Sequence, residues 1–440
     1  MKIASRIFLG MAFFALIIAA WVIVLGATTN EQRQLELMRQ ADDYMQDKVF
    51  VFAMPLLEEA IGFNTEHTIE AENMLKEVYL QLIDERGMRR RYVNLLERQM
   101  SRPNASADVF IEAANFQLEM SRTAEALTIL RDGIARTGSE QLIAIYESNR
   151  YEYRLNHNIY DDVTMIYGRM IGVKQDGLWG IARSDGTILI PCEYDKVSTF
   201  SAGRAIVQQD GEIFAVNQSN NRIALLGENA SDFGNLSNNR LPLLFDGRWY
   251  RATGEFELGS GTFDWIGMHS NGKAAAQMGD RWGVIDSAAN WVIPPDYDGI
   301  IMDELGRSYA QGAVFVKRGD SVYLFVDGAQ VAGPFDNARP FGDEGYAAVE
   351  VNGQWGFINT SGDVKIPFQP RFRDALSFGQ HLAAVKIGDY WGFISLNGTL
   401  VIEAVYLDAK SFSNGSAPVL TERGWQLLTL IEYMEGPGGL

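Results

Sequence analysis

The side chains that most often carry acid–base or metal chemistry are sparse in this sequence. It has one cysteine and four histidines, and His67, His157, His269 and His381 form no i,i+4 pair of the kind that binds zinc on a helix. No G-x-S-x-G nucleophile motif, H-E-x-x-H motif or phosphate-binding loop occurs. We therefore predict no catalytic residue, no metal ligand and no cofactor, and we expect a protein that is not an enzyme.

Three aspartates, Asp195, Asp298 and Asp336, follow an aromatic or apolar residue at one place of a recurring segment. A ring of such carboxylates could coordinate calcium. An Asx turn that closes each segment is the plainer interpretation, and we favour it.

Two irregular segments are the best candidates for a binding surface. One, "GEFELGSGTFDWIGMHSNG", places Trp265 and His269 in a glycine-rich stretch, and the other, "IIMDELGRSY", lies in the longest copy of the recurring segment. Exposed aromatic rings can stack on sugars or anchor a peptide. Packing in the core is the alternative for Trp265.

A basic cluster stands out in the acidic chain. Arg89, Arg90 and Arg91 follow one another in "RGMRRRYVNLLER". They could form a docking patch for an acidic partner or a lipid headgroup. The alternative is a solvated helix face that is balanced by Asp84, Glu85 and Glu97.

The composition excludes one class of partner and one kind of crosslink. The 440 residues carry a formal net charge of -18, so phosphate backbones are repelled and we expect no nucleic-acid partner. A single cysteine, Cys192, permits no intrachain disulfide. The length favours at least two folded regions.

The amino terminus has the pattern of a membrane anchor. Lys2 and Arg6 precede an uncharged apolar run over residues 7–26, which as a helix would span a hydrocarbon core. A cleaved signal peptide is the alternative, but its apolar stretch is usually shorter. We predict an uncleaved signal anchor in the inner membrane, with residues 1–6 cytoplasmic and the bulk of the chain periplasmic or otherwise extracytoplasmic.

Residues 27–160 are rich in helix formers. In "SADVFIEAANFQLEMSRTAEALTILRDGIARTGS" the small residues Ala114 and Ala126 would let two antiparallel helices approach closely. This unit resembles a tetratricopeptide repeat, although an aromatic is missing near Gln117 and Gly138 replaces the closing proline. An irregular helical bundle is an equal alternative.

The carboxyl-terminal part is a repeat. Trp-Gly pairs and their weaker counterparts recur at intervals of 34, 36, 33, 40, 33, 36 and 34 residues. Turn pairs such as Asp185-Gly186 and Asn397-Gly398 predict two-residue hairpins between short strands. We interpret the tryptophan as a cover for the neighbouring unit and the glycine as room for its backbone. The structural repeat residues are Trp179, Gly180, Trp249, Trp282, Gly283, Trp355, Gly356, Trp391, Gly392 and Trp425.

These segments resemble the WG repeat family, which implies β-rich repeats and no particular activity. We predict a β-propeller of seven or eight units over residues 161–432, with a flexible tail over residues 433–440; a β-solenoid is the alternative. The last copy stops after two strands, which suits a unit completed by pairing with the first.

Two interaction modules behind one anchor favour a membrane-anchored scaffold or assembly protein that binds other proteins of the bacterial cell envelope. The alternative is an envelope glycan-binding or sensor protein that uses aromatic faces of the ring.

Overall fold

The computed structural model describes residues 29–225 and 230–434, and the chain divides into two compact units, Met1–Glu147 and Ser148–Leu440. The predicted anchor, residues 7–26, and the segment 1–6 lie outside the described residues, as do residues 435–440 of the predicted tail. In the part of the chain that is described, no helix has the length and apolar character needed to cross a membrane.

The first unit is helical, and neighbouring helices in the sequence contact one another from α2 to α6. A helical segment over residues 29–46 comes first. It is followed by α2 (Phe50–Ala60), the 3-10 helix η1 (Ile61–Phe63), α3 (Thr68–Gln81), α4 (Met88–Met100), α5 (Ala107–Glu119), α6 (Thr123–Thr137) and α7 (Glu140–Asn149).

Small residues hold α5 and α6 together, as the sequence predicts. Ala114 and Ala126 are both fully buried. Gly133 on α6 is equally constrained, because a Cβ there would lie 2.8 Å from Cγ of Phe110. Gly138 ends α6 in the left-handed region, with φ of 65°. The likeness to tetratricopeptide repeats itself stays a prediction.

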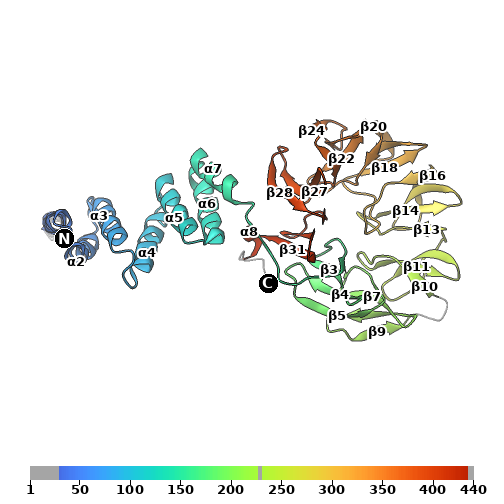
Figure 1. Ribbon diagram of the computed structural model, residues 1–440, viewed down its shortest axis with the longest axis horizontal. Coiled ribbons are helices and arrows are strands. Elements are labelled where there is room, and N and C mark those ends of the chain that lie inside the picture. The colour runs from blue at the N-terminus through green and yellow to red at the C-terminus, as the bar shows by residue number, and fades with distance from the viewer. Residues whose placement is uncertain (1–28, 226–229, 435–440) are drawn as a thin grey trace, which may run out of the picture. The chain divides into compact units, whose positions relative to one another are not determined.

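The second unit consists of eight antiparallel sheets, which we call blades 1 to 8 in chain order (Figure 1). Blades 1 to 4 are formed by β2 (Asp162–Val163), β3 (Met170–Gln175), β4 (Leu178–Arg183) and β5 (Ile188–Tyr194); β6 (Lys196–Val197), β7 (Arg204–Gln209), β8 (Glu212–Asn217) and β9 (Arg222–Leu225); β10 (Ala230–Phe233), β11 (Arg240–Phe245) and β12 (Arg248–Thr253); and β13 (Trp265–Ile266), β14 (Lys273–Met278), β15 (Arg281–Asp286) and β16 (Trp291–Tyr297).

Blades 5 to 8 repeat the pattern. They are formed by β17 (Gly299–Ile300), β18 (Ala313–Arg318), β19 (Ser321–Val326) and β20 (Ala329–Phe335); β21 (Asn337–Ala338), β22 (Tyr346–Val351), β23 (Gln354–Asn359) and β24 (Val364–Gln369); β25 (Phe372–Ala375), β26 (Leu382–Ile387), β27 (Tyr390–Ser395) and β28 (Leu400–Tyr406); and β29 (Asp408–Ala409), β30 (Ser416–Thr421), β31 (Gly424–Leu430) and β1 (Tyr153–Leu155). A short helix, α8 (Ile431–Met434), follows β31.

The last blade closes the ring with a strand from the start of the unit. β1 pairs antiparallel with β31, with Arg154 opposite Thr429. Gln426 donates a side-chain hydrogen bond of 2.8 Å to the carbonyl of Asn156, and β2 of blade 1 contacts β31. The unit is therefore an eight-bladed β-propeller and not a solenoid (Figure 1). The boundary between the helical region and the propeller differs from the predicted one, because β1 lies within residues 27–160, which were expected to be helical. The carboxyl-terminal part of the chain supplies only three strands of the last blade, so β1 provides the fourth.

Trp355 and Trp425 cover the next blade, as predicted for the repeat tryptophans. Trp355 of blade 6 packs in a core with Phe372 and Phe378 of blade 7. Trp425 of blade 8 packs against Tyr160 and other residues at the start of blade 1. These rings supply apolar area between sheets that could not bury both faces alone.

The glycine after tryptophan acts within its own blade, so the predicted role between repeats is wrong. A Cβ on Gly392 would lie 2.6 Å from the carbonyl oxygen of Ile402, and one on Gly180 would lie 2.5 Å from that of Ile190. Both oxygens belong to the outer strand of the same blade, where the strand pairing shifts register. Glycine makes room for this bulge.

The predicted two-residue turns are also different. At Gly186, φ is 90°, and its N–H donates to the Arg183 carbonyl, as in a three-residue loop with a left-handed glycine. The two-residue turns with two positive φ values lie one hairpin earlier, for example at Asp176-Gly177 (52° and 83°).

Candidate functional site

A cavity of about 600 Å³ lies at the centre of the propeller. Its walls are the residues that follow the short first strand of a blade, and seven of the eight blades contribute to it, all but blade 2. The first strands form only two to four residues of ladder before the chain turns outward, so the following side chains reach the axis of the ring. Tyr167 of blade 1 and Ser237 of blade 3 join their hydroxyls at 3.0 Å.

A loop of blade 5 contacts blades that are not its neighbours at this cavity. It is the irregular segment "IIMDELGRSY", residues 300–309. Asp303 shapes the loop by accepting the N–H groups of Leu305 and Arg307 at 3.0 and 2.9 Å. The Leu305 carbonyl accepts from the side chain of Asn235 in blade 3 at 3.0 Å. The segment that the sequence singled out therefore lines a site.

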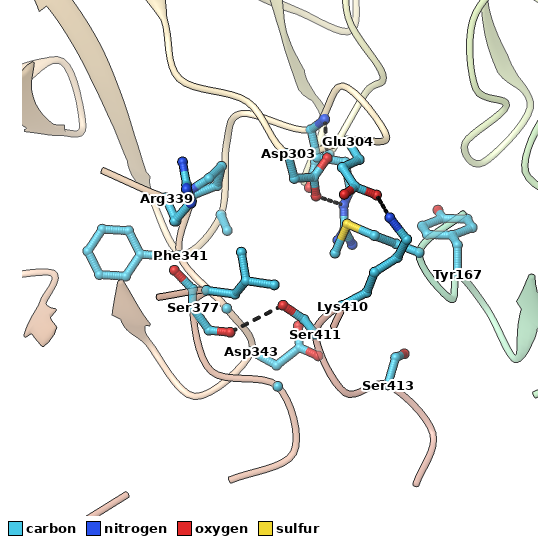
Figure 2. A pocket seen from close by; sticks show the side chains of 18 of the residues that line it. Tyr167, Asp303, Glu304, Arg339, Phe341, Asp343, Ser377, Lys410, Ser411 and Ser413 are labelled. Carbon is cyan, nitrogen blue, oxygen red and sulfur yellow. Dashed lines mark hydrogen bonds and ion pairs between the residues drawn. The ribbon is translucent and has the colours of Figure 1, made fainter. Parts of the chain in front are cut away.

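Ion pairs join distant parts of the chain across this cavity. Lys410 of blade 8 lies 2.5 Å from a carboxylate oxygen of Glu304 in the blade 5 loop (Figure 2). Because these residues are 106 positions apart, only the closed ring brings them together. Arg339 of blade 6 pairs with Asp374 of blade 7 at 2.9 Å.

The lining is acidic in balance. It contains five carboxylates and three basic side chains other than histidine, which leaves two carboxylates in excess. Within the described residues, Asp343 and Asp408 make no ion pair, and Asp343 is exposed. Asp408 accepts only the N–H of Ala409, at 2.8 Å.

Sequence reasoning missed Lys410 and Arg339. In their own blades, these two residues occupy the position that Leu376 occupies in blade 7. In all three residues the main-chain N–H donates to a carbonyl on the second strand of the same blade. The sequence did carry a signal for these two residues, because each places a charge at a repeat position that is apolar or small in the other blades.

His269 lines this cavity but is only 3 % exposed. Neither ring nitrogen reaches a partner at hydrogen-bonding geometry within the described residues. Burial, reinforced by the charges of Arg240 and Arg251, lowers the pKa of His269 to about 4, so the ring is neutral at pH 7. The predicted exposed contact is thus a buried one.

Trp265 does not join His269 at the cavity. It is half-buried on β13 and packs against Trp282, with ring centroids 5.4 Å apart. The packing alternative therefore describes its surroundings.

The predicted arginine patch lies on α4 of the helical unit. Arg89 pairs with Asp84 at 3.1 Å and Arg91 with Glu58 at 2.5 Å, while Arg90 is exposed. Two of the three charges are therefore paired, Arg89 with one of the acids considered in the sequence and Arg91 with an acid on α2. The docking role of the patch stays a prediction.

Two of the three repeated aspartates, Asp195 and Asp298, have structural partners. Asp195 accepts the N–H of Asp210 at 3.0 Å, and Asp298 accepts that of Gly319 at 2.7 Å. Each carboxylate fixes the hairpin turn of its own blade, which is a longer-range contact than the Asx turn we expected.

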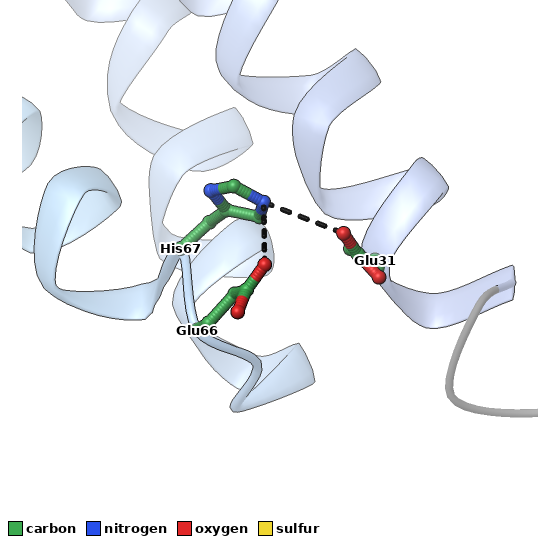
Figure 3. A group of neighbouring side chains, drawn as sticks. All are labelled: Glu31, Glu66 and His67. Carbon is green, nitrogen blue, oxygen red and sulfur yellow. Dashed lines mark ion pairs between the residues drawn. The ribbon is translucent and has the colours of Figure 1, made fainter. Parts of the chain in front are cut away.

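One cluster of possible metal ligands occurs in the helical unit, within the described ranges. Glu31, Glu66 and His67 place one ligand atom each within 4.8 Å of the others (Figure 3). Nε2 of His67 lies 3.6 Å from a carboxylate oxygen of Glu31 and 3.8 Å from one of Glu66. Glu70 lies on the other ring nitrogen at 3.7 Å.

The fold defines the class of protein, an eight-bladed β-propeller built from one recurring unit. The family model described as "WG containing repeat" matches residues 179–212, 282–304, 335–355, 355–391 and 391–425. The propeller of this chain thus contains WG repeats over these residues. None of the curated proteins matches the chain.

Solved structures resemble the chain weakly. Hsv2 of Kluyveromyces lactis is 9% identical with a TM-score of 0.35, covering 61% of this chain and 98% of that one. YCF48 from Cyanidioschyzon merolae is 14% identical with a TM-score of 0.33, covering 63% and 98%. The extracellular domain of the putative one component system BT4673 from B. thetaiotaomicron is 10% identical with a TM-score of 0.33, covering 63% and 40%.

Proposed function

We propose that this protein is a non-enzymatic scaffold of the bacterial cell envelope whose propeller holds a polypeptide segment of a partner protein in the central cavity. The observation that carries the proposal is the charge of the cavity wall. Its basic side chains are already paired, Lys410 with Glu304 and Arg339 with Asp374, whereas Asp343 and Asp408 have no counter-ion in the described structure. A partner segment with a lysine or arginine side chain would supply the missing charge.

The cavity also has the size and polarity for a segment of chain. A volume of about 600 Å³ is typical of ligand sites. Hydroxyls of Ser377, Ser411 and Ser413 line it beside the acids, and Figure 2 shows them around the same space. Such groups can pair with the amides of a bound peptide.

The glycan-binding alternative receives less support. Among the described residues of the propeller, no tryptophan is exposed, and Tyr390 is the only exposed aromatic ring, at 47%. Stacking on a sugar needs an accessible face of an aromatic ring. The inner-membrane location and the anchor over residues 7–26 remain part of the proposal and rest on the apolar run of the sequence.

Site-specific crosslinking in membranes tests the proposal. A photo-crosslinking amino acid at Ser411 should capture a polypeptide, and the same group at Val364, which is 50% exposed on the outer strand β24, is the matched control. Asp343→Asn with Asp408→Asn should lower the yield at Ser411 severalfold, because the charges that attract the basic segment are lost.

Equal capture from both positions, or a yield that does not respond to the aspartate substitutions, would contradict the proposal. Attachment to peptidoglycan or polysaccharide alone would favour the glycan-binding alternative.

A further inference from the structure

The contact of blades 3 and 4 differs from the contact of blades 6 and 7 in one group of three residues. At one of the three places, the first residue of the second strand, blades 2 and 4 also carry a basic residue, Arg204 and Lys273. Between blades 6 and 7, Phe378 packs on Phe357 with ring centroids 4.9 Å apart and on Tyr346 at 5.9 Å. Between blades 7 and 8, Phe393 and Phe412 form the same kind of pair at 4.8 Å.

Polar residues take these places at the contact of blades 3 and 4. Arg251 on β12 corresponds to Phe357 on β23, Arg240 opens β11 as Tyr346 opens β22, and His269 corresponds to Phe378. The residues equivalent to Arg251 in the other seven blades are Ile181, Ala215, Val284, Leu324, Phe357, Phe393 and Leu427, all at most 1% exposed. Three aromatic rings are thus replaced by two guanidinium groups and an imidazole, which we call the arginine cluster.

The arginine cluster has no partner for its buried polar atoms. Nε of Arg240, Nε of Arg251 and both nitrogens of His269 are buried without a hydrogen bond of good geometry, although the backbone of Asp286 lies close to the His269 ring. Neither arginine makes an ion pair within the part of the chain that the structure describes. Leaving such groups unpaired is costly, so the arrangement indicates a ligand that supplies acceptors.

The neighbouring acids do not neutralise the cluster. Asp286 is close enough to feel the charge of Arg251, but its carboxylate accepts the N–H groups of Ala288 and Asn290 at 2.8 and 2.9 Å. Glu257 is exposed. The cluster is therefore electropositive in a chain whose net charge is -18.

The cluster is also open to a ligand. A second cavity of about 420 Å³ is lined by Arg240, Arg251, Asn239 and Thr253. Asn238 lines this cavity and the central one, which His269 also lines. The three side chains thus lie beside two cavities, and the two arginines line the second one.

We propose that Arg240, Arg251 and His269 form a binding site for the oxyanion group, carboxylate or phosphate, of a small acidic ligand. Guanidinium groups bind both kinds of oxyanion through paired N–H donors, and a neutral imidazole adds one donor. The site goes beyond the proposed scaffold function, since it requires neither a partner protein nor the acidic wall of the central cavity.

Titration of the full-length protein with inorganic phosphate and, separately, with succinate tests this site. Ionic strength is held constant with sodium chloride, and binding is followed by calorimetry and by the melting temperature. We expect saturable binding of at least one anion, and the tighter of the two identifies the oxyanion as phosphate or carboxylate.

Two variants and a control make the test specific. Arg251→Phe with His269→Phe restores the aromatic pair of the other blades, so it should fold and lose the binding. Arg251→Lys keeps the charge but loses the planar fork, so binding should weaken about tenfold. Arg281→Gln removes an arginine that pairs with Asp298 on the surface and should bind as the wild type does.

Two results would overturn the proposal. One is no saturable binding of either anion to the wild-type protein. The other is binding to the Arg251→Phe/His269→Phe variant, or to Arg251→Lys, that equals that of the wild type; the lysine variant decides the question if the aromatic one does not fold.

Discussion

At the scale of single residues, the repeat depends on positions where one atom too many cannot be accommodated. The nearest atoms to a Cβ on Gly392 are main-chain atoms of Ile402 and Ala404, at 2.6 and 2.7 Å. On Gly356 the nearest atom is Cδ1 of the Phe368 side chain at 2.9 Å, and the nearest main-chain oxygen is at 3.0 Å. A side chain can rotate away, whereas a strand cannot.

Gly392→Ala should therefore destabilise the propeller more than Gly356→Ala. Overpacking of this kind costs about 1–3 kcal/mol, and we expect Gly392→Ala near the upper end. Urea unfolding followed by tryptophan fluorescence measures both variants. A Gly356→Ala variant that is the less stable of the two would show that the close main-chain contact does not decide the cost.

His269 should make the stability of the propeller depend on pH. Its pKa in the folded protein, about 4, lies below the ordinary value of 6.5, so the unfolded chain takes up the proton first. The contribution is fully present above the unfolded value and is lost as the pH falls from 6.5 toward 4, by about 3 kcal/mol in all.

His269→Phe should remove this part of the acid sensitivity. Comparison of unfolding free energies at pH 7 and pH 4.5 measures it, and His381→Phe, which changes an exposed histidine, is the control. An equal loss of stability in wild type and His269→Phe would contradict the expectation.

At the scale of elements, the helical unit joins α3 to α4 through a buried charge. Glu72 is fully buried, and Arg102 and Arg98 reach its carboxylate at 2.7 and 3.5 Å. The two arginine side chains keep 32% and 48% of their surface in contact with solvent. The acid depends on its partners, whereas the arginines can be hydrated without the acid.

Removal of the arginines should thus cost more than removal of the acid. Arg98→Leu with Arg102→Leu leaves a buried carboxylate uncompensated and should lower the stability of the helical unit by about 3–5 kcal/mol. Glu72→Gln should cost about 1–2 kcal/mol, the value of charge-assisted hydrogen bonds. The helical circular-dichroism signal in urea reports both, and the reverse order would contradict the argument.

At the scale of the molecule, the ring is closed by three residues. Tyr153 and Leu155 of β1 pack against the core of blades 7 and 8, and the strand pairs with β31. Without β1 the last blade keeps three strands and exposes an unpaired edge.

Deletion of all residues before 157 should destabilise the propeller by about 3 kcal/mol or more, from the lost apolar burial and hydrogen bonds. Because Ile431 donates to the Glu152 carbonyl, residues 152–156 can be placed after residue 431 through a two-residue turn. This rearranged chain should recover the melting temperature of the intact unit. Failure to recover it, or no loss on deletion, would show that β1 does not close the ring.

The sequence by itself determined the units of this fold. A period near 34 residues, turn residues and the Trp-Gly pairs predict short strands and a ring, because turn geometry and strand alternation are local properties. It also predicted the contact of α5 and α6, since Ala114 and Ala126 mark a close approach. The glycine of each Trp-Gly pair was expected to make room for the next blade, whereas it makes room for the outer strand of its own blade. A sequence does not show which strand lies over a given residue.

Only the tertiary structure decided the sites. Lys410 pairs with Glu304 because a closed ring brings the starts of distant blades to one axis. His269 lies close enough to Arg251 to feel its charge because adjacent blades pack face to face. In the sequence each of these residues is a single exception in one copy of the repeat. Their chemistry arises from ring closure, which depends on non-local strand pairing and is therefore not written in any one unit.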